Sequence, residues 1–269
     1  MINRIKNSIR VRGLRFFNLI LGYSKTPELI NIGIESFGND YGCGYAPKGM
    51  INEKSVVIAV GAGEDNTCEV DMVKTYGCNV DIYDPTPRAI AHFDQLVENT
   101  KNGVKTLVNN DTKQIYNISD AEVGKLHFHS LGLWNEDTQI SFFSPEIEDH
   151  VSHSIMQENM SDKSITVEVK CLGTIMKMLE VDEIDYLKID IEGAEYEVLD
   201  EIVSKRYNVK SLYIEFYLLD SDPLLSKARI NKYLKKMINV GYIPVESPEA
   251  HELRYLFVRK DLLKQGIVK

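Results

Sequence analysis

Apolar runs alternate with amphipathic stretches between residues 55 and 240. The segments 55–60 and 79–84 are short and mostly apolar, and each is followed by a stretch whose apolar residues lie three and four positions apart. The first pattern is typical of buried strands, and the second of helices that cover a sheet. We therefore predict strands at 55–60 and 79–84 and helices at 64–77 and 86–103. Because strands and helices alternate, the strands should run parallel and be joined by right-handed crossovers.

Three further strands continue this pattern. They are predicted at 125–131, 185–193 and 211–217, with helices at 171–180, directly after 193 and at 226–240. The chain closes with two more strands, at 241–247 and 253–260, and the connection between them is too short for a helix. Strands joined in this way are antiparallel neighbours. The predicted fold is therefore an α/β, Rossmann-like sheet of seven mostly parallel strands that ends in a C-terminal antiparallel hairpin strand.

The segment 132–163 interrupts the alternation. It is rich in polar and turn-forming residues, and within it only 138–143 (TQISFF) has the composition of a strand. The following segment, 164–170 (SITVEVK), alternates polar and apolar residues as a half-buried strand does. We expect these two segments to pair as a hairpin-like insertion.

The N-terminal residues differ from the rest of the chain. Residues 1–25 contain no acidic residue, and aliphatic and aromatic side chains lie between their cations. Such a helix can lie on anionic lipid, with its apolar face at the acyl boundary and its cations near the headgroups. The same pattern suits a helix that packs on its own protein or on a second subunit of a homo-oligomer. We treat 1–34 as a basic, helical N-terminal extension and 35–269 as one main domain. The extension could contact lipid, the body of its own protein or a second subunit, and these three possibilities stay open. The cations before residue 16 are Arg4, Lys6, Arg10, Arg12 and Arg15.

Composition narrows the classes of function and environment. The chain has 269 residues and a net charge of −9, which argues against a surface that neutralises the phosphates of nucleic acid. Its four cysteines form no C-x-x-C pair, which favours reduced thiols and a cytoplasmic location. No apolar run reaches the roughly 18 residues of a membrane-spanning helix. We expect a cytoplasmic protein in which only the N-terminal extension could reach the inner face of a membrane.

A glycine-rich turn follows the first strand. In AVGAGEDN, Gly61, Ala62 and Gly63 allow close approach of the backbone to a ligand, and the next helix begins with unpaired N–H groups. Asp84 ends the second strand, 23 residues after Gly61, where an acidic side chain can bind ribose hydroxyls. Its alternative role is that of a turn residue in DPTP. Because Asn66 stands where a dinucleotide fingerprint has its third glycine, the loop suits an adenosine with a non-phosphate tail better than a pyrophosphate.

Three carboxylates are expected at the carboxyl edge of the sheet. Asp190 and Glu192 should point to the same side if the fourth strand continues through them, and Glu215 lies in the fifth strand. They could hold the cofactor or the acceptor, or act as a general base, whereas Glu192 could instead be the acidic start of a helix. Their spacing supports no metal site, so we predict no metal. At the end of the third strand, His129 and Ser130 should lie near the adenine side of the site.

Four motifs and a glycine-rich stretch carry a family resemblance. They are VVIAVGAGEDN, IYDPTP, FHSLGLWNED, LKIDIEGAEYEVL and the preceding SFGNDYGCGY (36–45). Of these, LKIDIEGAEYEVL is the most specific. The chain resembles the FkbM-type family of S-adenosylmethionine-dependent methyltransferases, and the resemblance covers roughly residues 35 to 260.

The resemblance implies a class I methyltransferase fold, S-adenosylmethionine as cofactor, and methyl transfer to oxygen, often a hydroxyl on a sugar or a polyketide-like product. Our leading hypothesis is a hydroxyl of a saccharide or surface-glycan precursor. Ala59 departs from the acidic residue that is often found two positions before the first glycine. A catalytically silent nucleotide-binding subunit is therefore kept as an alternative. A nicotinamide-dependent oxidoreductase on a similar scaffold is the other alternative, although the absent third glycine and the terminal antiparallel hairpin count against it. By the resemblance, Gly61 and Gly63 would line the methionine side, Asp84 would bind the ribose, and Asp190 with Glu192 would face the transfer site. With the residues argued from their position in the sheet, the predicted cofactor-binding residues are Gly61, Ala62, Gly63, Asp84, Pro85, Ser130 and Asp190, and the predicted catalytic residues are Asp190, Glu192 and Glu215.

Overall fold

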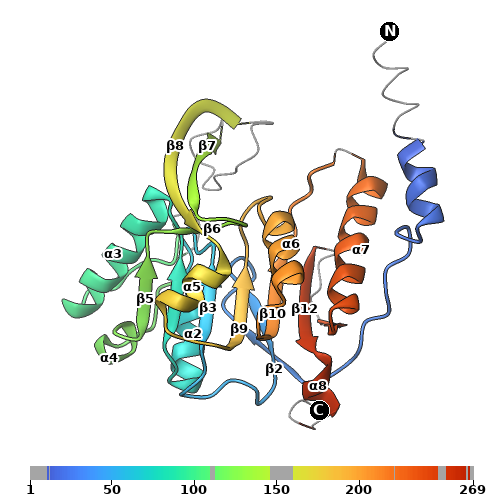
Figure 1. The fold of residues 1–269 in the computed structure, drawn as a ribbon. Coiled ribbons are helices and arrows are strands. Elements are labelled where there is room, and N and C mark those ends of the chain that lie inside the picture. Colours follow the sequence, from blue (N-terminus) through green and yellow to red (C-terminus); the bar gives the residue numbers. More distant parts are fainter. Residues whose placement is uncertain are drawn as a thin grey trace.

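The computed structural model describes residues 11, 13–109, 113–145, 160–220, 222–247, 253–264 and 266. Its centre is a seven-stranded sheet in the order β11-β12-β10-β9-β3-β4-β5 (Figure 1). β12 is antiparallel to both of its neighbours, and the other pairs are parallel. The predicted mostly parallel sheet with its C-terminal antiparallel hairpin strand is therefore confirmed. The strands are β3 (Val57–Val60), β4 (Val80–Tyr83), β5 (Leu126–His129), β9 (Ile184–Ile189), β10 (Val209–Glu215), β11 (Tyr242–Val245) and β12 (Arg254–Arg259).

The chain order places a topological switch point between β3 and β9. From β3 the chain moves outward through β4 to β5, and it then returns to form β9 on the other side of β3. Ligands of open α/β sheets bind beyond the carboxyl ends of strands at such a point. These carboxyl ends lie at the top of Figure 1.

Helices cover both faces of the sheet. Side chains alternate along β3, so that Val57 and Ala59 join one apolar cluster while Ile58 and Val60 join the other. The first cluster includes α2 (Thr67–Tyr76), α3 (Pro87–Lys101) and α8 (Lys260–Lys264). The second includes α5 (Leu172–Met178), α6 (Glu195–Lys205) and α7 (Pro223–Asn239). A further short helix, α4 (Asp120–Val123), precedes β5 and, like α8, was not predicted.

Two smaller sheets are attached to this core. β7 (Thr138–Pro145) and β8 (Met160–Lys170) pair antiparallel, which confirms the predicted hairpin-like insertion, and β6 (Gly132–Leu133) pairs with β8. The part of the insertion between 145 and 160 lies outside the described residues. The second sheet, β1 (Ile34–Phe37) with β2 (Gly44–Pro47), was not predicted. It joins the core through Phe37 and Tyr45.

Residues 13–20 are helical and lie beside α7 (Figure 1). Arg15 pairs with Asp222, and farther along α7 the side chain of Asn231 donates to the carbonyl of Tyr23 at 2.7 Å. Among the described residues, no helix is both long and apolar enough to span a membrane. Residues 1–10 and 12 of the predicted extension lie outside the described part of the chain.

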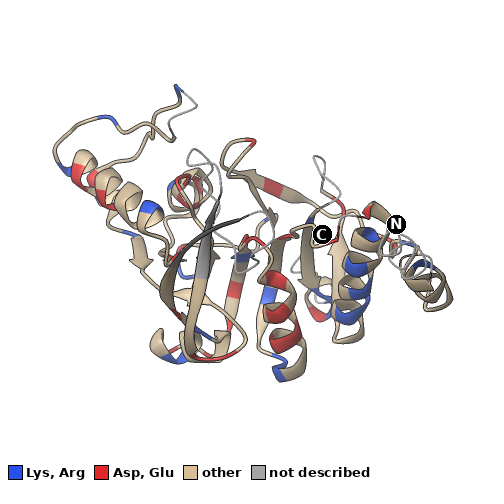
Figure 2. Cartoon of the chain, turned by 90° about the horizontal axis from the view of Figure 1, so that it is seen from above, with Lys and Arg blue, Asp and Glu red and all other residues tan. Residues whose placement is uncertain are grey.

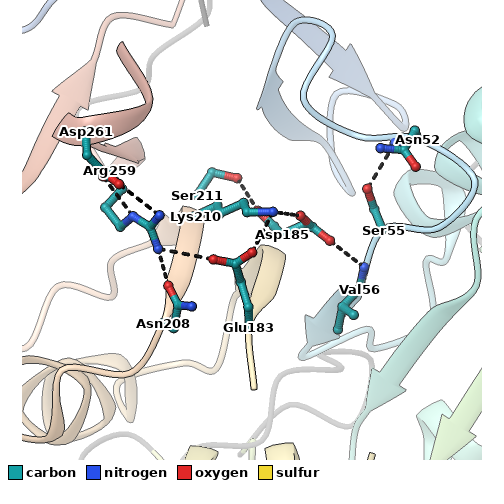
Figure 3. Close-up of polar contacts among 10 residues, drawn as sticks. All are labelled: Asn52, Ser55, Val56, Glu183, Asp185, Asn208, Lys210, Ser211, Arg259 and Asp261. Carbon is teal, nitrogen blue, oxygen red and sulfur yellow. Dashed lines mark hydrogen bonds and ion pairs between the residues drawn. The ribbon is translucent and has the colours of Figure 1, made fainter. Parts of the chain in front are cut away.

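A polar network joins the strands at the opposite edge of the sheet (Figure 3). Lys210 of β10 bonds Asp185 of β9 at 2.6 Å and Glu183 at 2.7 Å. Asp185 also accepts a hydrogen bond from the backbone N–H of Val56 at 2.8 Å, and Arg259 of β12 pairs with Glu183. These contacts tie β9, β10 and β12 together at the edge away from the glycine turn.

Candidate active site

The glycine turn after β3 touches the end of β9. Gly61 has φ +82°, and its N–H donates to the carbonyl of Tyr83 at 3.0 Å. A Cβ atom at this position would lie only 1.6 Å from the carbonyl oxygen of Asp190. Only glycine permits this approach, because any side chain would overlap the backbone of the neighbouring strand. The turn and Asp190 are thus held together as two walls of one cleft.

Asp84 forms the wall on the β4 side. Its Oδ2 accepts from the N–H of Gly63 at 2.9 Å, and its Oδ1 accepts from the N–H of Thr86 at 2.9 Å and from Thr86 Oγ1 at 2.6 Å. Asp84 therefore organises the DPTP turn, which was the second of its two predicted roles. A carboxylate offers about four acceptor positions, so one of them stays available to a ligand. Asp84 is only 5% exposed, and that exposed part faces the cleft.

Asp190 and Glu192 reach the cleft by a different route from the predicted one. β9 ends at Ile189, and Glu192 has φ +50°, so a turn rather than a continuing strand delivers its carboxylate. Buried Glu195 fixes this turn by accepting from the N–H of Gly193 at 2.7 Å and from that of Tyr217 beyond β10. The premise of a longer strand was wrong, but both carboxylates line the cleft.

The cleft is strongly acidic beside this turn. Burial raises the pKa of Asp190 well above its usual range, and the negative charge of Glu215 is the second largest cause of this shift. Partial desolvation at the mouth of the cleft also raises the pKa of the Tyr41 hydroxyl, and the charges of Asp190 and Glu192 add to that effect. Glu215 itself is paired with Arg254 of β12 at 2.7 Å. The negative charge is therefore concentrated between the ends of β9 and β10, and Asp190 holds a proton more tightly than an ordinary aspartate.

A buried ion pair supports the floor of the cleft. Lys188 of β9 and Glu69 of α2 lie 3.0 Å apart, with side chains only 4% and 1% exposed. Glu69 follows the glycine turn on the first turn of α2, so this pair fixes that helix against the strand carrying Asp190. Lys188 also contributes to the lining of the cleft.

The hairpin of β1 and β2 closes one side of the cleft. In its connecting loop, Asn39 donates to Asp65 at 2.8 Å, and a Cβ atom on Gly42 would lie 2.8 Å from the carboxyl carbon of Asp65. Arg254, which also pairs with Glu215, donates to Cys43 Sγ at 2.8 Å. The glycine-rich stretch 36–45 therefore packs against the cofactor loop and presents Tyr41 at the mouth of the cleft.

The structure brings nearly all of the proposed site residues together. Among the cleft-lining residues are Gly61, Ala62, Gly63, Asp84, Pro85, Asp190, Glu192 and Glu215. Ser130 is not among them; it is exposed, and Gly132 and Leu133 line the cleft in its place. His129 is held away by a 2.8 Å contact with Asp81 and by stacking on Tyr83.

Several lining residues were missed by sequence reasoning. The density of glycine in 36–45 indicated a tightly packed loop, but no spacing rule placed that loop over the cleft. Lys188 was hidden inside an apolar run, and Arg254 comes from the far end of the chain. The missed lining residues include Tyr41, Gly42, Asp65, Tyr83, Thr86, Leu133, Lys188, Ile191 and Arg254. Within the described part of the chain, no group of three or more His, Cys, Asp or Glu residues is placed to hold a metal ion.

The fold and the cleft define the class of the protein. A seven-stranded sheet in this order, a glycine turn after its central strand and an acidic residue at the end of the next strand are the features of a class I methyltransferase. Residues 47–244 match the methyltransferase FkbM domain, so the chain belongs to this family. It is a methyltransferase that depends on S-adenosylmethionine.

The chain is also similar to solved structures at low identity. One is a Methanococcus jannaschii fibrillarin pre-rRNA processing protein, with 10% identity, a TM-score of 0.41 and coverage of 81% of this chain and 71% of that chain. Another is precorrin-6y C5,15-methyltransferase from Geobacter metallireducens GS-15, with 11% identity, a TM-score of 0.36 and coverage of 78% and 82%. A third is M. jannaschii TYW2 in complex with AdoMet, with 10% identity, a TM-score of 0.31 and coverage of 78% and 72%. No curated protein matches the chain significantly.

The residues of the cleft fit the cofactor. The close approach of Gly61 to Asp190 leaves backbone rather than side chains facing the methionine part, and the free acceptor position of Asp84 suits a ribose hydroxyl. Ala59, where an acidic residue is often found, is buried in the sheet and does not line the cleft. A carboxylate for the cofactor's amino group must therefore come from elsewhere in the lining of the cleft.

Proposed function

We propose that the protein transfers a methyl group to a hydroxyl oxygen of a saccharide or surface-glycan precursor, with Asp190 as the proton acceptor. The observation that carries this proposal is the position of Asp190, which abuts the glycine turn and faces Glu192 and Glu215 in one cleft. The carboxylates can accept hydrogen bonds from several hydroxyls at once, as a polyhydroxylated acceptor requires. They also disfavour an anionic acceptor group, since they would repel its charge.

The surroundings of Asp190, Glu215 and Tyr41 suit each of them to a different role. Asp190 has a raised pKa, and a general base is most effective when its pKa lies near the working pH. Glu215 is held by Arg254, which fits it to orient a neighbouring hydroxyl rather than to take a proton. Tyr41 is 61% exposed at the mouth of the cleft and offers an apolar ring face together with a hydroxyl.

Little else is required of the protein. The bound cofactor supplies a methyl group that is already activated as part of a sulfonium. The chain's own residues then have to hold the acceptor oxygen in line, exclude water and receive one proton, and alignment alone can supply much of the barrier reduction. No residue needs to form a covalent intermediate.

Substitution of Asp190 by asparagine tests the proposal. With a labelled methyl donor and a panel of saccharides, Asp190→Asn should lower the rate of transfer by about 10²-fold or more, the usual contribution of a general base. Asp182→Asn is the matched control, because Asp182 is exposed and precedes β9 outside the cleft. Transfer to a saccharide that survives in Asp190→Asn would disprove the role of Asp190. Methylation of amines but of no saccharide would disprove the acceptor class.

A further inference from the structure

The N-terminal helix, residues 13–20, exposes almost all of its apolar side chains. Phe16 and Ile20 are 65% exposed, Leu19 is 60% exposed and Phe17 is 57% exposed. Surface residues of this size usually occur singly, and a contiguous group marks a contact surface. The helix is attached to the protein mainly by polar contacts, among them the pair of Arg15 with Asp222, so its apolar side chains are left for another partner.

Cations of the described chain lie beside these apolar side chains. The chain carries no acidic residue before Glu28, although its net charge is −9. The neighbouring helix α7 adds lysines along its outer face, and Figure 2 shows them beside the N-terminal helix. Of these, Lys227 and Lys232 are exposed, and Lys235 bonds the carbonyl of Gly22 at 2.6 Å. Exposed aromatic and aliphatic residues rimmed by cations match an anionic bilayer, which offers acyl chains beneath negative headgroups.

A second protein suits this surface less well. Lysine is depleted at protein–protein interfaces, because its flexible ammonium group is costly to order and desolvate. The helix lies beside the beginning of α7, because Arg15 pairs with Asp222, the residue that caps α7.

From this arrangement we infer that the N-terminal helix and the outer face of α7 together form a surface that docks on anionic phospholipid bilayers. Phe16, Phe17, Leu19 and Ile20 enter the acyl boundary, and Arg15 with Lys227 and Lys232 contacts the headgroups. The inference concerns binding and is independent of the chemical identity of the acceptor.

Vesicle flotation of the full chain tests the inference. The protein should float with vesicles of phosphatidylcholine mixed with phosphatidylglycerol, and much less with vesicles of phosphatidylcholine alone. Phe16→Ser with Phe17→Ser should weaken the partitioning by at least about tenfold, because apolar area is lost, and Lys227→Gln with Lys232→Gln should weaken it on anionic vesicles only. The matched control is Val104→Ser with Met178→Ser, which removes exposed apolar residues elsewhere and should leave flotation unchanged.

Binding of S-adenosylhomocysteine verifies that each variant is folded. The inference is overturned if the unaltered chain stays with the soluble fraction, or if the control variant loses flotation as fully as the phenylalanine variant. It is also overturned if sedimentation velocity shows a dimer that the phenylalanine substitutions dissociate while vesicle binding is absent, because the surface would then bind a second copy.

Discussion

Gly61 and Gly63 provide a matched pair for testing the cofactor loop. Both have positive φ, +82° and +54°, so alanine at either site pays the cost of a left-handed conformation, about 1–2 kcal/mol. They differ in surroundings: a Cβ atom on Gly63 meets nothing within 4 Å, whereas one on Gly61 lies 1.6 Å from the carbonyl oxygen of Asp190. Real Cβ atoms are almost never found closer than 3.0 Å to such an atom, so Gly61→Ala has to separate the loop from β9 by at least 1.4 Å, the difference of these two distances.

That displacement should abolish most of the cofactor affinity. A misplacement of about 1 Å at an active site can cost about 10²-fold in rate, and we expect Gly61→Ala to weaken the binding of S-adenosylhomocysteine by a similar factor. Gly63→Ala should weaken it by less than about tenfold, because its conformational strain is present in the free protein as well as in the complex and so largely cancels in binding. Isothermal titration calorimetry on both variants, with thermal melting to verify folding, measures the difference. Equal losses in the two variants would refute the argument that close approach to Asp190 defines the site.

Three other substitutions address charge and stability. Lys188→Met should destabilise the protein by about 3–5 kcal/mol in a denaturation experiment, because it leaves Glu69 buried and unpaired. The double variant Lys188→Met with Glu69→Met should recover most of this loss. A double variant as unstable as the single one would contradict the prediction. Burial raises the pKa of Glu195 from 4.5 to about 7, so protonated Glu195 favours the folded state. This protonation contributes about 3 kcal/mol to the free energy of unfolding. The contribution is fully present below pH 4.5 and is lost as the pH rises to about 7. Glu195→Gln should remove that part of the pH dependence of the melting temperature, and an unchanged profile would argue against it. Asp84→Ala should weaken S-adenosylhomocysteine binding markedly without unfolding the protein, whereas unchanged affinity would assign Asp84 to the turn alone.

The sheet could be predicted from the sequence because its signals are local. Runs such as SVVIAV are buried on both faces, and the intervening helices are amphipathic, so strand, helix and connection all followed from short windows. Gly77 ends α2 with φ +67°, the left-handed conformation that glycine commonly adopts after the last turn of a helix. Most of the cleft followed as well, because the carboxyl ends of parallel strands meet at one edge whatever their order in the chain.

The remaining features depend on contacts between distant residues. Arg254 reaches the cleft from β12, and no local pattern connects it with Glu215 in β10. The hairpin of β1 and β2 is rich in glycine, which carries a weak strand signal, and its fit against Asp65 arises only in the folded chain. Ser130 was misplaced relative to the cleft because β5 ends at His129, and the chain then turns away before Gly132 and Leu133 reach the lining.

A crystal structure with S-adenosylhomocysteine would test the account most directly. The account predicts that the ribose hydroxyls lie against Asp84 and that the homocysteine part lies along the turn from Gly61 to Gly63, with Asp190 beside the position of the sulfur. A nucleoside bound away from Asp84, or a ligand held outside the space between the glycine turn and Asp190, would contradict it.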